Sequence, residues 1–338
     1  MPIAPLTQSP PAMGTGTGST PVTQVLSLGA HLPEGVLSNA DLEAMVETSD
    51  TWIVERTGIR ERRRVAPEET VVTMGTAAAR EALLRAGNPA LDAIIVGTCS
   101  GPTRLPAAAC LIQRELGLSG EAAFDVNAAC SGFVYGLGIA DSMIRSRSAR
   151  TILVVAAEAL TPLVDYGDRS TCVLFGDGAA AAVVGAGAGG GIKAVRWGAD
   201  GAQSQLIYFG AHVDDPEGAH AIRMAGKGTF RTAVERLTET CLQLCGDAGW
   251  SGSDVDWFIP HQANLRIIEA VAKRLDVSMD RVVLNVERVG NTSAASIPLA
   301  LYEADAAGRL RPGQRILSVA FGAGVTWGGI ALEWTGSR

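Results

Sequence analysis

The segment LDAIIVGT, residues 91–98, decides the fold class of this chain, because a similar pattern returns as DWFIP at residues 256–260. Each segment places an aspartate before a short apolar run, which is typical of a strand buried on both faces of a parallel sheet. TILVVAA at 151–157 and RILSVAF at 315–321 have the same character. Apolar residues at three- and four-residue spacing predict helices between these strands, over residues 70–87, 106–116, 131–147, 226–246, 265–275 and 296–307. The alternation predicts an α/β protein.

The four strands form two pairs at a constant offset of 164 residues (256 − 92 = 164). Asp92 precedes one strand and Asp256 precedes its repeat, and the second pair of strands follows at the same distance. The offset also aligns Asn127, in VNAACSG, with Asn291, in GNTSAAS. Chance similarity of short apolar runs is the alternative, but three matches at one offset favour an internal duplication. Fused halves would bring their corresponding loops together.

Length and composition agree with two core units. The chain has 338 residues, of which 47% are apolar and 19% are charged, and this length exceeds that of a usual single hydrophobic core. We therefore predict an N-terminal half over residues 24–190 and a C-terminal half over residues 191–338. Residues 1–23 are rich in Pro, Gly, Ser and Thr, which predicts a disordered tail.

Charge and hydropathy exclude other classes of protein. The net charge of -7 and the isoelectric point near 5.2 argue against a nucleic-acid-binding surface. No apolar stretch both reaches spanning length and lacks glycine or charge, so we predict no membrane segment. The tail lacks the basic and apolar regions of a secretory signal, and we therefore expect a cytoplasmic location.

Cys130 is the first candidate for chemistry. The six cysteines lack the spacing of a zinc site, so we expect no bound metal and a buried, apolar role for most of them. Cys130 differs because it stands where the apolar stretch AAFDVNAA meets SGFVYGLGIADSMIR, which has a helical pattern. The positive end of a helix dipole favours a thiolate near neutral pH. For this residue alone, a structural cysteine is an equally good interpretation.

His261 and Asn291 are two further candidates for chemistry. His261 follows the strand DWFIP and opens HQANLRIIEAVAKRL, so it stands where a strand meets a helix. A single histidine is more often a structural hydrogen-bonding group, and its place at a strand end makes it a candidate. Asn291, in RVGNTSAASIPLALYEA, can donate an amide hydrogen to an oxygen. A helix cap and glycosylation of Asn-Thr-Ser are its alternatives, although a cytoplasmic chain is not glycosylated in this way.

The glycine-rich runs need separate interpretations. FGAGVTWG, residues 321–328, follows the last long apolar strand and can aim a backbone N–H at an oxyanion near Cys130. GAGAGG, residues 185–190, has the spacing of a dinucleotide loop, but the GIKAVRW that follows predicts a strand, so we expect no nicotinamide site. FGDG at 175–178 is a common turn and is informative only beside the other motifs.

Taken together, these segments resemble β-ketoacyl-acyl carrier protein synthase III, a condensing enzyme of the thiolase-fold family. The resemblance runs from about Leu26 through Trp334 and includes TSDTWIVERTGIRERR, FDVNAACSGF, FGDGAAAAVV, MAGKGTF, IPHQANLRII, GNTSAASIPLAL and FGAGVTWG. It implies a thiolase-like, five-layered αβαβα fold built from two duplicated halves. It also implies a homodimer.

The resemblance further implies a catalytic triad of Cys130, His261 and Asn291. In this family the cysteine attacks an acyl-CoA thioester, and the histidine and asparagine then bind the carbonyl oxygen of a malonyl thioester during decarboxylation. The implied oxyanion donors are the backbone N–H groups of Cys130 and of Ala323, which stands where the family has glycine. We therefore expect an acyltransferase that condenses an acyl-CoA primer with malonyl-acyl carrier protein and initiates fatty acid synthesis. Coenzyme A enters as a thioester substrate, and no cofactor or metal is implied.

Other positions are assigned by the same resemblance. The residues that would bind coenzyme A are Trp52, Arg56, Arg169 and Asn264. Leu105, directly before Pro106, would bound the primer pocket where acetyl-selective members carry an aromatic ring, so we expect primers longer than acetyl. The basic patch that would bind the carrier protein consists of Arg231, Arg266, Lys273 and Arg274. A solvated helix face explains the last two almost as well.

Two alternatives concern function. Specialised relatives that form pyrones, or that transfer acyl groups between carrier-bound chains in secondary metabolism, share this triad. A catalytically silent subunit that only binds a carrier protein would not need Cys130, His261 and Asn291 together.

Overall fold

The computed structural model of this chain describes residues 20–210 and 220–337. The strands in this part of the chain are β1 (Val22–His31), β2 (Gly35–Ser38), β3 (Glu61–Arg64), β4 (Ala93–Gly97), β5 (Ala122–Val126), β6 (Thr151–Glu158), β7 (Gly178–Gly187), β8 (Gly191–Ala199), β9 (Ile207–Phe209), β10 (Ile222–Met224), β11 (Trp257–Phe258), β12 (Arg315–Gly322) and β13 (Thr326–Glu333). The α-helices are α1 (Asn39–Glu43), α2 (Asp50–Thr57), α3 (Val71–Arg85), α4 (Ala108–Leu116), α5 (Gly132–Arg145), α6 (Gly226–Ala248), α7 (Leu265–Arg274), α8 (Val286–Val289) and α9 (Ser296–Ala306).

The two main sheets have the same topology. The first has the strand order β1-β7-β6-β4-β5, and the second has the order β8-β13-β12-β11 when it is written from its last strand. The pair β4·β6 is parallel like β11·β12, and the remaining shared pairs are antiparallel in both sheets. In place of a second β5, a single parallel bridge joins Phe258 to Val282. The predicted duplication is confirmed by these matching strand orders.

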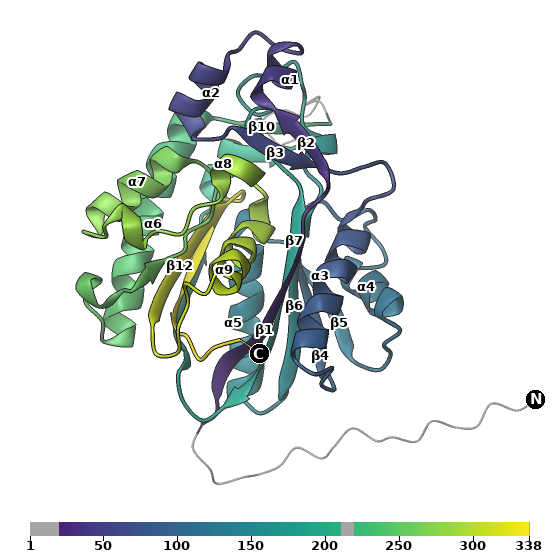
Figure 1. The fold of residues 1–338 in the computed structure, drawn as a ribbon, viewed down its shortest axis with the longest axis vertical. Coiled ribbons are helices and arrows are strands. Elements are labelled where there is room, and N and C mark those ends of the chain that lie inside the picture. The colour runs from purple at the N-terminus through teal and green to yellow at the C-terminus, as the bar shows by residue number, and fades with distance from the viewer. Residues whose placement is uncertain (1–19, 211–219, 338) are drawn as a thin grey trace, which may run out of the picture.

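The helices complete five layers (Figure 1). Helices α3 and α4 cover the outer face of the first sheet, and α6 and α7 cover the outer face of the second. Helices α5 and α9 lie between the sheets, where Phe133 and Leu299 belong to one buried cluster. The inner strand faces are apolar because each of these sheets is covered on both sides. The predicted αβαβα architecture is confirmed.

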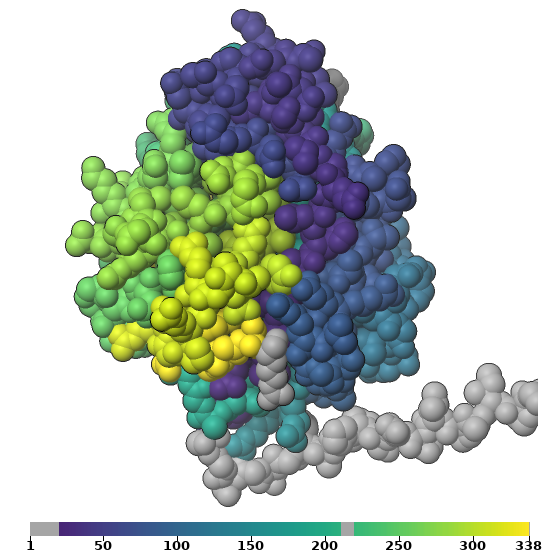
Figure 2. All heavy atoms as spheres, in the orientation of Figure 1, coloured from purple at the N-terminus to yellow at the C-terminus, as the bar shows by residue number. Residues whose placement is uncertain are grey.

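A cap closes one end of the layers (Figure 2). It contains the ribbon β2·β3 and helices α1 and α2, and it packs against the segment 160–175. Arg62, on β3, is fully buried there and donates from Nη1 to the Leu37 carbonyl at 3.1 Å and from Nη2 to the Val173 carbonyl at 2.8 Å. Burial lowers the pKa of this guanidinium to about 10. The cation is held by carbonyl dipoles, and it connects the cap to the first half.

The structure corrects some boundaries. The predicted tail lies mostly outside the described residues, but Val22 and Thr23 already belong to β1, because they pair with Gly187 and Ala186. The chain passes from the first sheet to the second between β7 and β8, at residues 187–191. Two glycine-rich segments for which we predicted no strand contribute to strands: residues 185–187 end β7, and residues 321–328 contain the end of β12 and the start of β13. The strand predicted in GIKAVRW is β8.

Candidate active site

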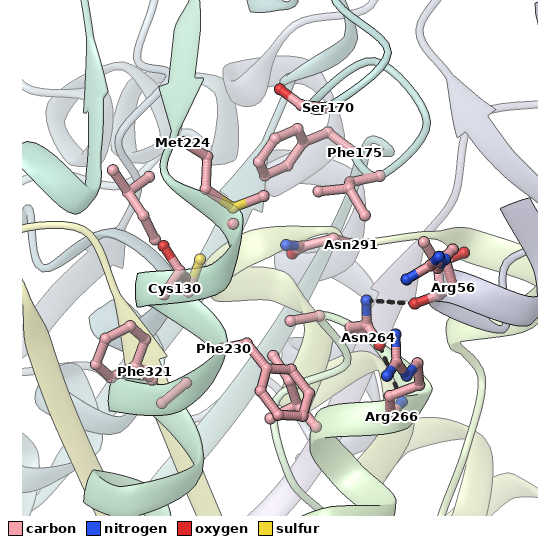
Figure 3. A pocket seen from close by; sticks show the side chains of 18 of the residues that line it. Arg56, Cys130, Ser170, Phe175, Met224, Phe230, Asn264, Arg266, Asn291 and Phe321 are labelled. Atoms are coloured by element: carbon pink, nitrogen blue, oxygen red, sulfur yellow. Dashed lines mark hydrogen bonds between the residues drawn. The ribbon is translucent and has the colours of Figure 1, made fainter. Parts of the chain in front are cut away.

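A pocket of about 510 Å³ opens between the cap and the second half (Figure 3). Cys130, His261 and Asn291 all line it, so three residues far apart in the sequence share one cavity. Its wall is largely apolar and includes Met224 and Phe321. Other apolar wall residues come from β9, α6, α7 and the segment before β7. This arrangement suits a flexible acyl chain that ends at a polar floor.

Cys130 lies at the start of the central helix of the first half. It belongs to a 3-10 turn, Ala129–Ser131, that runs directly into α5. Burial raises the pKa of its thiol to about 12, against a smaller lowering by a hydrogen bond with Ser293. Burial of this thiol therefore opposes the thiolate that we expected near neutral pH. The dipole of α5 favours the thiolate, but it acts only near the helix end. The loss of water around the sulfur has the larger effect on the pKa of the thiol.

The turn between β12 and β13 packs on the backbone of Cys130. A Cβ atom on Gly322 would lie 2.7 Å from the Cys130 nitrogen, so this close approach requires glycine. Thr326 secures the turn by donating from Oγ1 to the Ala128 carbonyl at 2.8 Å. Ala323 follows Gly322 and does not adopt a left-handed backbone, so alanine fits this position without strain. The structure thus places Ala323 in the turn that meets the Cys130 loop.

His261 continues the edge of the second sheet into the pocket. Its N–H donates to the Val319 carbonyl at 2.8 Å, and the next residue, Gln262, donates to the Val283 carbonyl at 3.1 Å. The ring Nδ1 lies 2.6 Å from the Ser296 hydroxyl oxygen, which accepts a hydrogen bond from the Gln262 N–H at 3.3 Å. We assign the Ser296 hydrogen to the bond with Nδ1, which leaves the ring proton on Nε2. Burial lowers the pKa of His261 to about 3, so the ring is neutral and can donate from Nε2.

Asn291 is positioned by the FGDG segment. Its N–H donates to the Leu174 carbonyl at 2.8 Å, and its carbonyl accepts from Gly176 at 3.0 Å. The side-chain oxygen caps the following 3-10 turn by accepting from the Ser293 N–H at 2.9 Å. Asn291 is only 6% exposed, which excludes glycosylation. The capping alternative is confirmed as a contact, yet it uses only the oxygen, and Figure 3 shows the amide end turned toward the space beside Cys130.

The pocket mouth collects aromatic and basic groups. Trp52 lies in the first turn of α2, where the Ser49 hydroxyl caps its N–H at 3.1 Å. The Arg169 guanidinium stacks 4.7 Å from the ring centroid of Trp52. Asn264 caps α7 and donates to the Arg56 carbonyl at 3.0 Å, which connects the cap to the second half. All four residues predicted to bind coenzyme A therefore lie at or beside one opening.

Comparison with known proteins identifies this architecture. The sequence profile for the 3-Oxoacyl-[acyl-carrier-protein (ACP)] synthase III C terminal matches residues 245–334, and the 3-Oxoacyl-[acyl-carrier-protein (ACP)] synthase III profile matches residues 124–201. Beta-ketoacyl-[acyl-carrier-protein] synthase III of Xanthomonas campestris pv. campestris is 48% identical over 319 residues, covering 92% of this chain and 98% of that protein. The chain belongs to the synthase III family.

Solved structures of synthase III relatives agree. The 3-oxoacyl-[acyl-carrier-protein] synthase III from Aquifex aeolicus VF5 superposes with a TM-score of 0.88 and 46% identity, covering 92% of this chain and all of that one. The priming beta-ketosynthase of the R1128 polyketide biosynthetic pathway has a TM-score of 0.90 and 37% identity, covering 96% of this chain. The relatives with the higher identities carry the synthase III name, so the specialised alternative is not favoured.

The predicted carrier patch is spread along the outer helices of this synthase III chain. Arg266 is exposed at the start of α7 and also lines the pocket mouth, with its guanidinium 5.8 Å from the Phe230 ring centroid. Arg231 is exposed on α6. Lys273 and Arg274 are exposed at the far end of α7, and Arg274 lines a separate cavity. Arg266 is thus the only member of the predicted patch that lines the pocket.

Leu105 does not line the pocket of its own chain. Its side chain is 86% exposed on the segment between β4 and α4. Leu105 therefore does not bound this pocket from within its own chain, and its role as a primer-limiting residue stays a prediction.

Several polar residues of this synthase III site were not among the predicted ones. Lys227 lines the mouth, Ser296 contacts His261, and Glu158 lies beneath the Cys130 loop. The sequence offers a signal for Ser296 alone. The offset of 164 residues aligns Ser296 with Gly132, the first residue of α5. Within residues 20–210 and 220–337, no helix is long and apolar enough to cross a membrane, and no His, Cys, Asp and Glu side chains gather as a metal site.

Proposed function

We propose that this chain condenses an acyl-CoA primer with malonyl-acyl carrier protein, releasing CO2 and coenzyme A, and so initiates fatty acid synthesis. The observation that carries the proposal is the meeting of Cys130, His261 and Asn291 at the floor of one apolar pocket. The reaction as proposed draws its enolate from decarboxylation and calls for no metal or nicotinamide. A cytoplasmic location is part of the same proposal.

The first half-reaction forms a thioester on Cys130. The sulfur attacks the thioester carbonyl of the acyl-CoA, and the coenzyme A thiolate leaves. Negative charge develops on the carbonyl oxygen, which the backbone N–H groups of Cys130 and Ala323 would stabilise as an oxyanion hole. The packing of Gly322 against the Cys130 nitrogen supports this assignment, because it brings both backbones together.

The second half-reaction makes the carbon–carbon bond. Loss of CO2 from the malonyl thioester leaves an enolate, whose oxygen would accept hydrogen bonds from His261 Nε2 and from the Asn291 amide. A neutral His261 suits this role because it donates without giving its proton away. The enolate carbon then attacks the Cys130 thioester and regenerates the cysteine.

The charges at the mouth fit these substrates. Arg56, Lys227 and Arg266 line the opening of a chain whose net charge is -7. The Trp52 ring, already stacked on Arg169, offers a flat surface for an adenine, and the basic groups would bind phosphates. Arg231, Arg266, Lys273 and Arg274 would guide an acidic carrier protein toward the opening.

A homodimer also belongs to the proposal. Strand β5 is an edge of the first sheet, and its residues from Ala123 to Val126 are partly exposed. Such an edge favours pairing with the same edge of a second copy. The exposed Leu105 would then be buried at the interface, where it would reach the primer pocket of the second copy.

The proposal is tested with acyl-CoA thioesters of increasing length. Intact-protein mass spectrometry should find one acyl group on Cys130, and addition of malonyl-acyl carrier protein should release it as 3-ketoacyl-carrier. A Cys241→Ala protein should behave like the wild type, because Cys241 is buried between α6 and the second sheet. Acylation of another residue, or an acyl-enzyme that does not react with malonyl-carrier, would refute the proposal.

A further inference from the structure

Ser296 connects the two segments that carry the enolate donors of the proposed function. It is the first residue of α9, it is 0% exposed, and its N–H donates to the Ser293 carbonyl in the preceding 3-10 turn. Its hydroxyl oxygen lies 2.6 Å from His261 Nδ1 and accepts from the Gln262 N–H at 3.3 Å. Within residues 20–210 and 220–337, the Ser296 side chain makes only these two hydrogen bonds. The start of the helix therefore fixes a hydroxyl group against the histidine ring.

The N–H group of Gln262 is held in place by the side chain of the same residue. Gln262 is 0% exposed. Its Nε2 donates to two backbone carbonyls, at 2.8 and 3.1 Å, and its Oε1 accepts from two backbone N–H groups, at 3.1 and 3.3 Å. The side-chain amide has no further hydrogen to give, so a rotation would leave buried groups unpaired. The Gln262 N–H is thus a fixed donor to the Ser296 oxygen.

This fixed donor decides the direction of the hydrogen bond between Ser296 and His261. A hydroxyl group has one hydrogen and two acceptor sites. If His261 Nδ1 carried the ring proton, the Ser296 oxygen would accept from both His261 and Gln262, and its own hydrogen would lack an acceptor in a buried site. If Ser296 donates to Nδ1 instead, all of these groups are paired. The arrangement therefore favours a Nδ1 atom without a proton.

A neutral ring whose Nδ1 accepts a hydrogen bond carries its own hydrogen on Nε2. The ring is neutral because burial lowers the pKa of His261 to about 3. His261 lines the pocket and its Nδ1 is bound to Ser296, so Nε2 is the nitrogen that remains for a ligand. With the hydrogen on Nε2 the ring donates to an enolate oxygen, whereas the other tautomer would present a lone pair to that oxygen. The tautomer thus decides between attraction and repulsion.

One short segment serves both enolate donors. Residues 291–296 consist of Asn291, Thr292, the 3-10 turn Ser293–Ala295 and the first residue of α9. Asn291 lines the pocket at one end of this segment, and Ser296 contacts the ring of His261 from the other end. The same turn therefore holds the Asn291 amide and aligns the His261 ring, which fixes the two donors relative to each other.

We propose that Ser296 is a positioning residue for the second half-reaction, because it keeps the ring hydrogen of His261 on Nε2 and holds the ring beside Asn291. The inference rests on the proposed function, in which His261 donates to the enolate. Ser296 donates to Nδ1 throughout the reaction, and no proton passes between the two residues. Acylation of Cys130 does not use the His261 donor, so Ser296 should influence decarboxylation and leave acylation unaffected.

The tautomer of His261 is measured first, without any substrate. The chain has four histidines, so labelling with 15N-histidine gives few ring signals, and comparison with His261→Gln identifies those of His261. Near neutral pH, the 15N chemical shifts of the wild type should show a ring with its hydrogen on Nε2. Ser296→Ala should show a mixture of both tautomers, because Nδ1 then has no fixed donor. A wild-type ring with its hydrogen on Nδ1 overturns the inference.

The two half-reactions are then measured in Ser296→Ala. Decarboxylation of malonyl-carrier should be about 10-fold slower, the effect expected from losing one hydrogen bond, with an unchanged KM. Acylation of Cys130 should be nearly unchanged. Ser296→Thr keeps the hydroxyl group and should recover most of the decarboxylation rate. Ser27→Ala is the matched control, since it removes an equally buried hydroxyl that donates to the Ala82 carbonyl at 2.6 Å and does not line the pocket.

Each failure has its own meaning. Decarboxylation as fast in Ser296→Ala as in Ser27→Ala overturns the role of Ser296 and leaves the proposed function intact. Equal losses in both half-reactions overturn it as well, since they would indicate a general disturbance of the pocket. Absence of any acyl group on wild-type Cys130 refutes the proposed function itself, whereas the tautomer is measured without substrate and does not depend on that result.

Discussion

The loops at residues 127–132 and 291–296 share one backbone design and carry different chemistry. Each begins with an asparagine whose side-chain oxygen accepts from the N–H two residues later, at 3.4 Å from Ala129 and 2.9 Å from Ser293. The residues that donate these N–H groups, Ala129 and Ser293, have left-handed φ values of 46° and 48°. Each loop then forms a 3-10 turn that runs into a central helix, α5 or α9. The duplication has preserved the geometry of both loops.

The side chains at equivalent positions divide the reaction between the halves. Cys130 corresponds to Ala294, and His261 corresponds to Gly97, where a Cβ atom would lie 2.8 Å from the Gly132 carbonyl carbon. In the proposed function, one half therefore supplies the nucleophile, and the other supplies the donors for the enolate. A repeated backbone places groups around a common axis, and a few substitutions then decide which group each half contributes.

Moving the thiol between the halves should have the largest effect. Cys130→Ala should abolish acylation, because the nucleophile is lost. Adding Ala294→Cys should not restore it, since Ala294 is 1% exposed and packs toward Gly132 rather than into the pocket. Mass spectrometry after incubation with acyl-CoA measures both. An acyl group on the relocated cysteine would show that the two loops are chemically interchangeable.

Removing the donors of the second half should separate the two half-reactions. His261→Ala and Asn291→Ala should each slow malonyl decarboxylation by about 10²–10³, the usual effect of losing one oxyanion donor. Acylation of Cys130 should fall much less, because it depends on the first loop. Rapid-quench assays of each half-reaction provide the measurement, and equal losses in both would contradict the division between the halves.

His261 should also make the second half sensitive to acid, whereas Gly97 has no such group. The unfolded chain binds a proton near pH 6.5, but the buried ring does so only near pH 3, so stability falls as the pH drops between these values. From pH 7 to pH 5 the loss is about 2 kcal/mol. Urea unfolding of the wild type and of His261→Gln measures it. A variant with the full wild-type loss would assign the acid sensitivity to other groups.

The smallest effect is expected on the outer helices. Arg266→Glu on α7 should raise the KM for malonyl-carrier about 3- to 10-fold, with a weaker effect at high salt, and leave Cys130 acylation nearly unchanged. Arg114→Glu, on α4 of the other half, should leave this KM unaltered, since Arg114 lies away from the pocket and pairs with Glu115. Similar KM values in both proteins would remove Arg266 from the carrier surface.

The sequence predicted what depends on local patterns. Buried strands such as β6 and β12 are apolar runs, and their constant offset was sufficient to infer two halves. Cys130 and His261 were candidates because they stand where a strand meets a helix, but the assignment of both with Asn291 as a triad came from the family resemblance. The strand β7 was missed, because its small residues, GAAAAVVGAG, resemble a loop although they fit a sheet that is closely covered on both faces.

Properties that depend on several segments could not be predicted. The raised pKa of Cys130 follows from burial of its thiol beside the β12–β13 turn, which is distant in sequence, and Ser293, also distant, lowers this pKa by a smaller amount. Glu158 reads as the polar end of a strand until residues 98–100 and Ser293 surround it. The surface position of Leu105 could not be inferred either, because a family resemblance does not specify which chain a residue serves.

Arg62 has a consequence for local unfolding. Its guanidinium joins β2, Asn39 of α1 and Val173, and its Cβ would lie only 2.9 Å from a Cβ placed on Gly290, beside Asn291. Opening of the cap would leave a buried cation without its oxygens and would disturb the segment that holds Asn291. The cap therefore cannot unfold by itself at a low free-energy cost. Its amide hydrogens should exchange together with those of the pocket floor, as one cooperative unit.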